Sequence, residues 1–182
     1  MLDQEMPANR QTVPRTEREA EIVAAARAEM LSTGFDEATL SSIARRAGMT
    51  AANVHYYFAT KEELLAAVLD RAYGSLFSSF EDVTSPMERL QGFVRFHTEH
   101  RQLRLAVHAV AARSAAVAAV LDRRDEWVTG TVGDLAGDGL DAAVLFAVVN
   151  GLVEMTTPHP DPDRVLEHGA AALLGSGRAR RS

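Results

Sequence analysis

The stretch from Thr39 to Lys61 reads TLSSIARRAGMTAANVHYYFATK, and two short helical patterns meet in it at Gly48. The apolar positions at helical spacing are Leu40, Ile43, Ala44 and Ala47 before the glycine, and Val54 and Phe58 after it. Gly48 can adopt the positive φ of a tight turn, Thr50 can cap the second helix, and a small Ala44 lets that helix cross close above the first. The pattern predicts a helix-turn-helix.

The second helix of this motif offers an outward face of hydrogen-bonding groups. It consists of Ala52, Asn53, Tyr56 and Tyr57, with His55 at the side. An Asn side chain can pair bidentately with an adenine edge, a small alkyl group can touch a thymine methyl, and Tyr hydroxyls reach phosphates. The face therefore suits a DNA major groove. A helical hairpin with an aromatic surface is the alternative interpretation.

The local charge of this stretch fits a polyanionic partner. No acidic residue occurs from Ala38 to Lys61, and Arg45, Arg46 and Lys61 give this window a charge of +3 in a chain of net charge −6. Residues 62–182 hold 12 basic and 17 acidic side chains. The N-terminal part is thus the part that we expect to contact DNA.

The motif resembles the TetR family of bacterial transcriptional regulators. The residues that carry the resemblance are Gly34-Phe35, Thr39, Ile43-Ala44, Ala47-Gly48, Thr50, the run from Val54 to Phe58, and Lys61-Glu62-Glu63-Leu64. The similar region covers about residues 16–76, with the motif itself at 39–58. In that family the first three helices bind operator DNA, and the remaining helices form a divergent domain that dimerises and usually binds a small molecule. This sequence departs from the family pattern at two positions, with His55 where Tyr is common and Ala52 where Gly is common.

The resemblance and the helix geometry together give a set of expected DNA contacts. We expect Tyr57 and Lys61 to bind phosphates and Asn53 and Tyr56 to reach base edges. The remaining expected contacts are Thr39 and Ser41 on the DNA backbone, with Thr50, Ala52 and His55 beside them.

Composition and helical periodicity predict an all-α protein with about nine helices. The expected domains are a flexible arm (1–14) that could instead enter a minor groove, a three-helix DNA-binding domain (15–62), a helical ligand-binding and dimerisation domain (63–176) and a disordered tail (177–182). Expected helices beyond the motif span residues 16–33, 61–80, 86–99, 101–113, 114–136, 140–156 and 162–175. Capping boxes are expected at Thr16 with Glu19, Thr60 with Glu63, and Ser85 with Glu88.

Cellular location follows from what the sequence lacks. The chain has no Cys, and its N-terminus has no apolar segment typical of a secretory signal. The most apolar window, residues 142–153, is too short to span a bilayer. The sequence thus predicts a cytoplasmic protein that does not enter a membrane.

The segment 140–155 predicts a homodimer, because it is apolar on nearly every side and needs cover all round. Together with the last helix, it would form a four-helix interface with a second copy. The expected interface residues are Val144, Val148, Gly151, Leu152, Met155, Leu166, Ala170 and Leu173. A buried central helix in a monomer is the alternative.

A ligand pocket is expected among the middle helices. Its walls would be Phe77, Phe93, Phe96, Val107 and Trp127, with His97, Arg104 and His108 as polar points. The same aromatic residues could be plain core instead. His97, His100, Arg104 and His108 are also the one constellation that could indicate a metal-dependent enzyme, but a helix boundary near His100 would break the geometry. No cofactor fingerprint or catalytic motif occurs.

The resulting functional prediction is a repressor that a small-molecule effector releases from operator DNA. The helix at 61–80, about 30 Å long, would act as the lever between the two domains. A small swing of it would spoil the match between two recognition helices and major grooves that repeat every ~34 to 36 Å. The alternatives are a helical interaction module and a metal-dependent enzyme, each without affinity for DNA.

Overall fold

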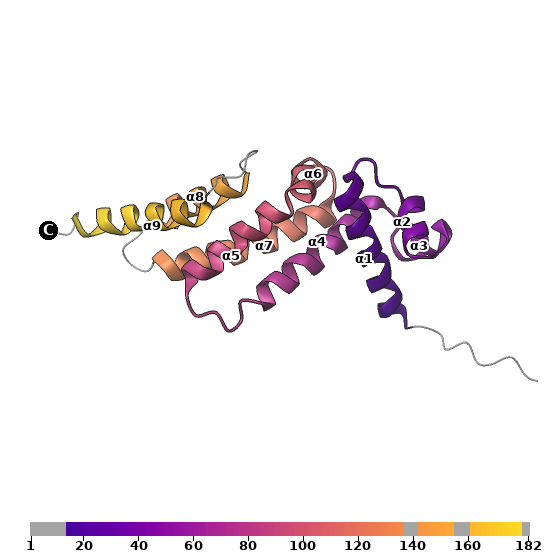
Figure 1. Cartoon of the computed structure of the whole chain (residues 1–182), viewed down its shortest axis with the longest axis horizontal. Helices are drawn as coiled ribbons and strands as arrows, with labels where there is room; N and C mark the ends of the chain where they lie inside the picture. The colour runs from indigo at the N-terminus through magenta and orange to yellow at the C-terminus, as the bar shows by residue number, and fades with distance from the viewer. Residues whose placement is uncertain (1–13, 137–141, 155–160, 180–182) are drawn as a thin grey trace, which may run out of the picture.

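The computed structural model describes residues 14–136, 142–154 and 161–179, and the regular secondary structure in this part of the chain is α-helix throughout. Its helices are α1 (Arg15–Thr33), α2 (Leu40–Arg46), α3 (Ala51–Tyr57), α4 (Lys61–Ser78), α5 (Pro86–Glu99), α6 (Arg101–Ala111), α7 (Ala115–Ala136), α8 (Ala142–Glu154) and α9 (Pro162–Ala179). Figure 1 shows α1, α2 and α3 at one end of an elongated molecule and α8 with α9 at the other, while α4 to α7 lie between them. The all-α prediction is confirmed.

The helix-turn-helix is held by local contacts, of which the sequence predicts the turn at Gly48 and the cap at Thr50 but not the capping box at Thr39. The Thr39 hydroxyl accepts a hydrogen bond from the Ser42 amide (3.0 Å), and the Thr39 amide donates to Ser42 Oγ (3.1 Å), which makes a capping box for α2. Gly48 has a φ of 67°, and the Thr50 hydroxyl accepts from the Asn53 amide (3.2 Å) at the start of α3. Val54 is fully buried between the helices.

The start of α1 differs from the prediction. Pro14 is the N-cap residue and no side chain caps the helix, so the expected capping box of Thr16 with Glu19 is wrong. Proline fixes φ near the helical value, which lets the helix begin at the next residue. Glu19 then accepts a hydrogen bond from Arg15 one turn earlier (2.8 Å).

The other boundaries deviate by a few residues. α4 ends at Ser78, where the Ser79 amide is shared between the carbonyls of Ser75 and Leu76 and the Phe80 amide bonds to a carbonyl three residues back, that of Phe77. α9 continues to Ala179, three residues into the expected tail. Thr60 and Ser85 cap α4 and α5 through the amides of Glu63 and Glu88, while the Glu63 carboxylate reaches the Ala59 amide (2.9 Å). Residues 1–13 of the expected arm (1–14), Met155 and residues 180–182 lie outside the described residues.

Two hydrophobic cores hold the helices together. The first joins the apolar faces of α1 to α4 with five residues of α6 and α7, namely Val107, Val110, Val117, Val120 and Leu121. The second lies among α5, α7, α8 and α9 and includes Leu90, Phe93, Leu145, Val149 and Leu166. The expected boundary between residues 62 and 63 is therefore not a packing boundary, because the first core extends across it.

Lys61 ties the start of α4 to the loop between α1 and α2. Its ammonium group donates to the carbonyl oxygens of Phe35 (2.7 Å) and Asp36 (3.0 Å), and lies 4.4 Å from the centre of the Phe35 ring. Phe35 itself is buried. This single side chain thus links two segments that are 26 residues apart.

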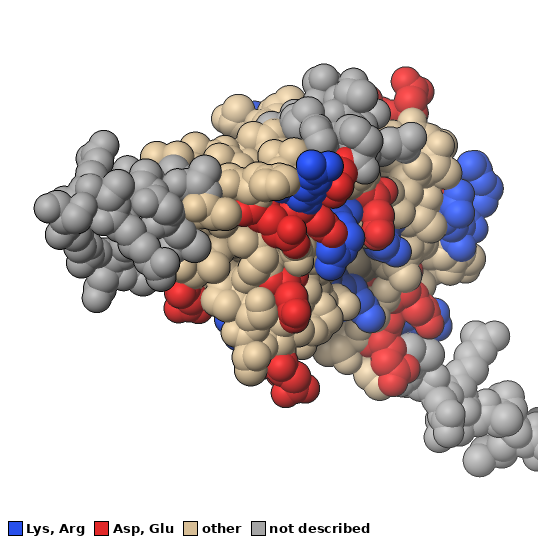
Figure 2. All heavy atoms as spheres, turned by 60° about the vertical axis from the view of Figure 1, so that its left-hand side comes forward, with Lys and Arg blue, Asp and Glu red and all other residues tan. Residues whose placement is uncertain are grey.

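The surface carries mixed charge. On the face shown in Figure 2, acidic and basic side chains are interspersed rather than separated into large patches. Among the described helices, none combines the length and apolar character needed to cross a membrane.

Candidate functional site

α3 presents the outward face that its sequence predicts. Asn53, His55 and Tyr56 are exposed, with 72% of Tyr56 accessible, while Tyr57 is half-buried. The Tyr56 and Tyr57 rings meet edge to face with centroids 5.2 Å apart. Ala52, Thr50, Ser41 and Thr39 are also exposed, and an open hollow of about 570 Å³ lies beside Thr50 and Asn53. The expected base-reading side chains are therefore accessible together on one face.

Two arginines of α1 lie beside this face and are missing from the sequence-based set. The Arg15 guanidinium carbon lies 5.8 Å and 5.6 Å from the ring centres of Tyr56 and Tyr57, and Arg18 lines the hollow next to Asn53. Arg15 pairs with Glu19, and the hydrogen bond that Arg15 donates to that carboxylate raises the pKa of Arg15 above its ordinary value. No local pattern marks these arginines, because only the packing of α1 against the motif brings them there.

The basic residues of the motif have unequal roles in the structure. Arg45 is exposed on α2. Arg46 instead donates through Nε to the largely buried Glu29 carboxylate of α1 (2.8 Å), and Lys61 donates to two backbone carbonyls. Two of the three positive charges thus hold α1, α2 and the start of α4 together. These two hydrogen bonds compete with the phosphate contact that the sequence predicts for Lys61.

Glu29 is an acidic group of α1 at its contact with α2. The hydrogen bond from Arg46 lowers the pKa of Glu29, and the Ser42 hydroxyl acts in the same direction. A carboxylate with a lowered pKa stays ionised at neutral pH and holds Arg46 in place. The pair joins α1 to α2 behind the exposed face of α3.

The expected ligand pocket separates into two parts. The rings of Trp127, Phe77 and Phe93 stack in the second core. The distance between ring centroids is 4.6 Å from Trp127 to Phe77 and 5.7 Å from Trp127 to Phe93. The other five expected residues, Phe96, His97, Arg104, Val107 and His108, line a small cavity of about 20 Å³. Tyr73, His100 and Arg124, which the sequence does not single out as pocket residues, complete much of its wall.

The histidines of this region are held by hydrogen bonds rather than arranged around a metal. His97 Nδ1 lies 2.9 Å from the Phe93 carbonyl oxygen and its Nε2 lies 3.0 Å from the Tyr73 hydroxyl. His100 Nδ1 donates to the Phe96 carbonyl (2.9 Å) and its Nε2 accepts from Arg27 (2.8 Å). Within the described chain no three His, Asp or Glu side chains gather as metal ligands.

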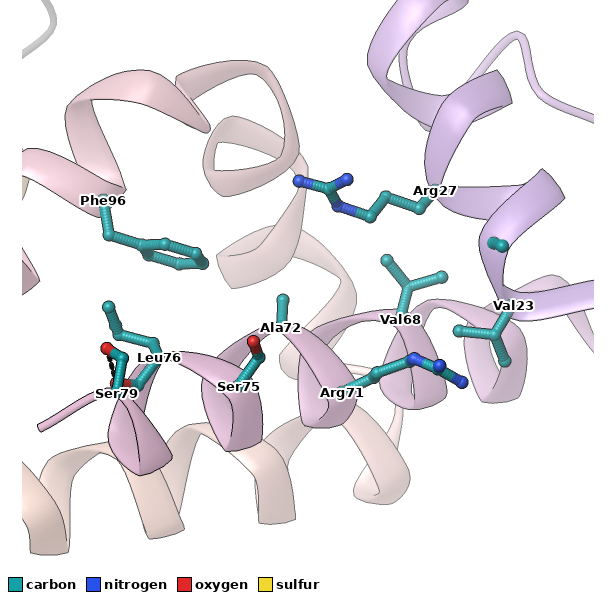
Figure 3. Close-up of a pocket in the computed structure, with 10 residues that line it drawn as sticks. Val23, Arg27, Val68, Arg71, Ala72, Ser75, Leu76, Ser79 and Phe96 are labelled. Atoms are coloured by element: carbon teal, nitrogen blue, oxygen red, sulfur yellow. Dashed lines mark hydrogen bonds between the residues drawn. The ribbon is translucent and has the colours of Figure 1, made fainter. Parts of the chain in front are cut away.

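A larger open groove of about 510 Å³ lies between α1, α4 and α5. Its floor is α4, and Figure 3 shows the Phe96 and Arg27 side chains reaching over it from opposite sides. Its apolar lining includes Val23, Val68 and Leu76. The groove therefore touches α1 of the N-terminal three-helix unit as well as α4 and α5.

The expected dimer residues lie on different sides of α8 and α9. Leu166 and Ala170 are buried in the second core of the chain itself, so they are not accessible to a partner in this arrangement. Val144 is 41% exposed, Gly151 is exposed, and Val148 and Leu152 are half-buried. Met155 and the Leu173 side chain lie outside the described residues.

Comparison with known proteins places this geometry in context. Residues 22–68 match the family model described as bacterial regulatory proteins of the TetR family. None of the curated proteins matches the chain.

Solved structures of transcription regulators share the fold over nearly the whole chain. A regulator from Rhodococcus sp. Rha1 has a TM-score of 0.68 at 23% identity, covering 87% of this chain and 94% of its own. A TetR regulator from Haloarcula marismortui has a TM-score of 0.65 at 24% identity, covering 90% and 98%. A regulator from Saccharomonospora viridis, solved in complex with choline, has a TM-score of 0.60 at 18% identity, covering 86% and 95%.

Proposed function

We propose that this chain, whose residues 22–68 match the TetR family model, is a repressor which a small-molecule effector releases from its operator. The observation that carries the proposal is the accessible face of α3, where Asn53 and Tyr56 stand out from a rigidly capped helix-turn-helix. A helix of this kind lies in the major groove with its exposed side chains on base edges. The solved relatives are regulators rather than enzymes, so catalysis is not favoured.

The DNA contacts separate into base-reading and positioning residues. Asn53 and Tyr56 read bases, while Tyr57, Thr39 and Ser41 contact the DNA backbone, with Thr50, Ala52 and His55 next to them. Arg15, Arg18 and Arg45 add positive charge at the edges of the same face. Arg15 and Arg18 form exposed ion pairs, and such pairs are worth little, so phosphates can replace their carboxylate partners.

A mobility-shift experiment across a salt series tests the proposal. The wild-type protein should bind DNA that flanks its own gene, with an affinity that falls steeply as salt rises. Asn53→Ala should lose roughly 1 to 3 kcal/mol on the operator and relax its sequence preference. Arg45→Met should weaken binding to all sequences about equally. Affinity that is absent or indifferent to salt would refute DNA binding, and equal losses for both variants on every sequence would refute the base-reading role of Asn53.

Effector binding would act through α4. This helix supplies residues to the first core and ends beside the aromatic stack of the second, so a displacement in the middle helices is transmitted to the head. The effector must bind the released state better than the DNA-bound state, and a hundredfold preference corresponds to about 2.7 kcal/mol of coupling. The choline complex of one structural neighbour supports the proposal that this chain binds a small molecule.

A homodimer completes the proposed function. The side of α8 that carries Val144 and Gly151 faces away from the core, with Val148 and Leu152 at its edge. A second copy covering this face would fix the distance between two α3 helices, which successive major grooves require. The cytoplasm, where the operator lies, is the proposed location.

A further inference from the structure

The open groove and the small inner cavity adjoin at the Phe96 side chain in the middle of the molecule. The open groove of about 510 Å³ and the inner cavity of about 20 Å³ share two lining residues, Ala72 of α4 and Phe96 of α5. Phe96 is half-buried, and Figure 3 shows its side chain projecting over α4 toward the groove. A rotamer change of this side chain would join the two spaces, because nothing but these two residues is common to both linings.

The inner cavity is lined by basic groups. Arg104 and Arg124 line the cavity and are 7% and 5% exposed. The imidazoles of His97, His100 and His108 also line it, and no carboxylate is among the described lining residues. Asp125, which lies outside that lining, pairs with Arg124 (2.6 Å). Charge buried at low dielectric interacts strongly with an opposite charge placed beside it. The cavity thus favours an anion and disfavours a cation.

The outer groove has a different character. Val23, Val68 and Leu76 give it an apolar surface, and a volume of about 510 Å³ is within the range of small-molecule sites. Arg27 stands at its rim and donates to His100 Nε2 (2.8 Å), so the rim connects directly to the inner wall. An apolar body fits this groove, and the positive rim would attract an anionic end group.

We propose that these two spaces form one site for an amphipathic carboxylate, with its apolar body in the groove and its carboxylate beyond Phe96, between Arg104 and Arg124. A planar carboxylate is a small anionic head group and matches the guanidinium fork in a bidentate manner. The proposal rests on the proposed function, because it names the chemical class of the effector. The apolar body of the ligand would contact both Val23 of α1 and Val68 of α4. These helices join the DNA-binding head to the rest of the chain.

Three matched probes test the site on the full-length protein without DNA. They are 4-cyclohexylbutanoate, the neutral 4-cyclohexylbutan-1-ol and the cationic 4-cyclohexylbutylammonium. Trp127 is the only tryptophan and stacks on Phe77 at 4.6 Å, which in turn stacks on Tyr73 at 5.8 Å, so its fluorescence reports on the cavity wall. The acid should bind at least roughly tenfold more tightly than the alcohol, which corresponds to about 1.4 kcal/mol, and the ammonium should bind most weakly.

Variants assign the selectivity to residues. Arg104→Gln should bring the affinity for the acid close to that for the alcohol and leave the affinity for the alcohol unchanged. Arg27→Gln, at the accessible rim, should weaken binding of the acid by a smaller factor than Arg104→Gln does. It tests the anion site if Arg104→Gln does not fold. Arg164→Gln on α9 is the matched control, because Arg164 is exposed and lines neither space. It should change nothing.

The outcomes separate this inference from the proposed function. Equal affinities for acid and alcohol, tighter binding of the ammonium, or no binding of the acid at millimolar concentration would each overturn the anion site. A protein that binds DNA but shows any of these results retains its proposed function and loses this site. A protein that binds the acid selectively but never binds DNA keeps the site and loses the proposed function.

Discussion

Lys61→Met should destabilise the protein and leave the intrinsic DNA affinity of the folded protein nearly unchanged. Methionine keeps the apolar stem but removes both hydrogen bonds to the Phe35 and Asp36 carbonyls and the contact with the Phe35 ring. Because Phe35 is buried, the loss of the bond to its carbonyl oxygen should cost about 1 to 2 kcal/mol. The Asp36 carbonyl can turn to water, and the ring contact is worth about 0.5 to 1 kcal/mol. We expect a total of about 2 kcal/mol.

Urea denaturation followed by far-UV circular dichroism, at a fixed protein concentration, measures this loss. Lys61→Arg, which keeps the charge and the donors, should recover part of it. Arg45→Met is the control with the opposite expected outcome. It removes an exposed positive side chain, so it should lower the DNA affinity and have little effect on stability. Lys61 is the only lysine in the sequence, so its acylation rate, compared with that of the terminal amine, reports directly on its protection.

The reasoning fails if Lys61→Met unfolds at the same urea concentration as the wild type. A variant of unchanged stability that loses DNA affinity on every sequence would instead make Lys61 a phosphate ligand, as the sequence pattern and the family resemblance indicate. Rapid acylation in the folded protein would show that the ammonium group is not held by the carbonyls.

Three further changes probe the packing, the buried ion pair and the dimer. Gly92→Ala would place a Cβ 2.4 Å from Phe80 Cζ and push that ring from its stack on Trp127. We therefore expect the free energy of unfolding to fall by about 1 to 3 kcal/mol and the Trp127 emission to change. Unchanged emission would contradict the close approach of Gly92 to Phe80. The lowered pKa of Glu29 means that its ionised form adds stability above the ordinary pKa of about 4.3, and this contribution is lost as the pH falls through the folded-state pKa. The stability advantage of the wild type over Glu29→Gln should therefore shrink in urea titrations below about pH 4.3, and a constant advantage would argue against the pair with Arg46. Val144→Glu should shift the protein to a monomer in analytical ultracentrifugation, and a dimer of unchanged strength would exclude this side of α8.

The sequence predicts the helix-turn-helix well because its determinants are local. Gly48, Thr50 and the apolar spacing act within one or two helical turns, and the structure contains the predicted turn and cap. The capping box at Thr16 fails for an equally local reason, since Pro14 already supplies the helix start and Glu19 is drawn to Arg15. The extent of the motif is thus determined by neighbouring residues.

The candidate site beyond α3 depends on contacts that no local pattern encodes. Arg15 reaches the two tyrosines from a helix more than 40 residues earlier, and Lys61 bonds to carbonyls 25 and 26 residues away. Aromatic residues at helical spacing can line a pocket or fill a core, and only tertiary packing places Trp127 in the stack and Phe96 at the cavity. The sequence identifies the side chains, while the fold assigns their partners.

The extension of the first core into α7 affects how the protein is made. Synthesis proceeds from the N-terminus, and domains generally fold as units while the chain emerges from the ribosome. The apolar faces of α1 and α4 remain incompletely covered until Val117, Val120 and Leu121 have been synthesised and released from the exit tunnel. The nascent DNA-binding segment therefore exposes apolar surface for the time needed to translate about sixty further residues. Chaperones that bind exposed apolar surface would have access to it during that interval.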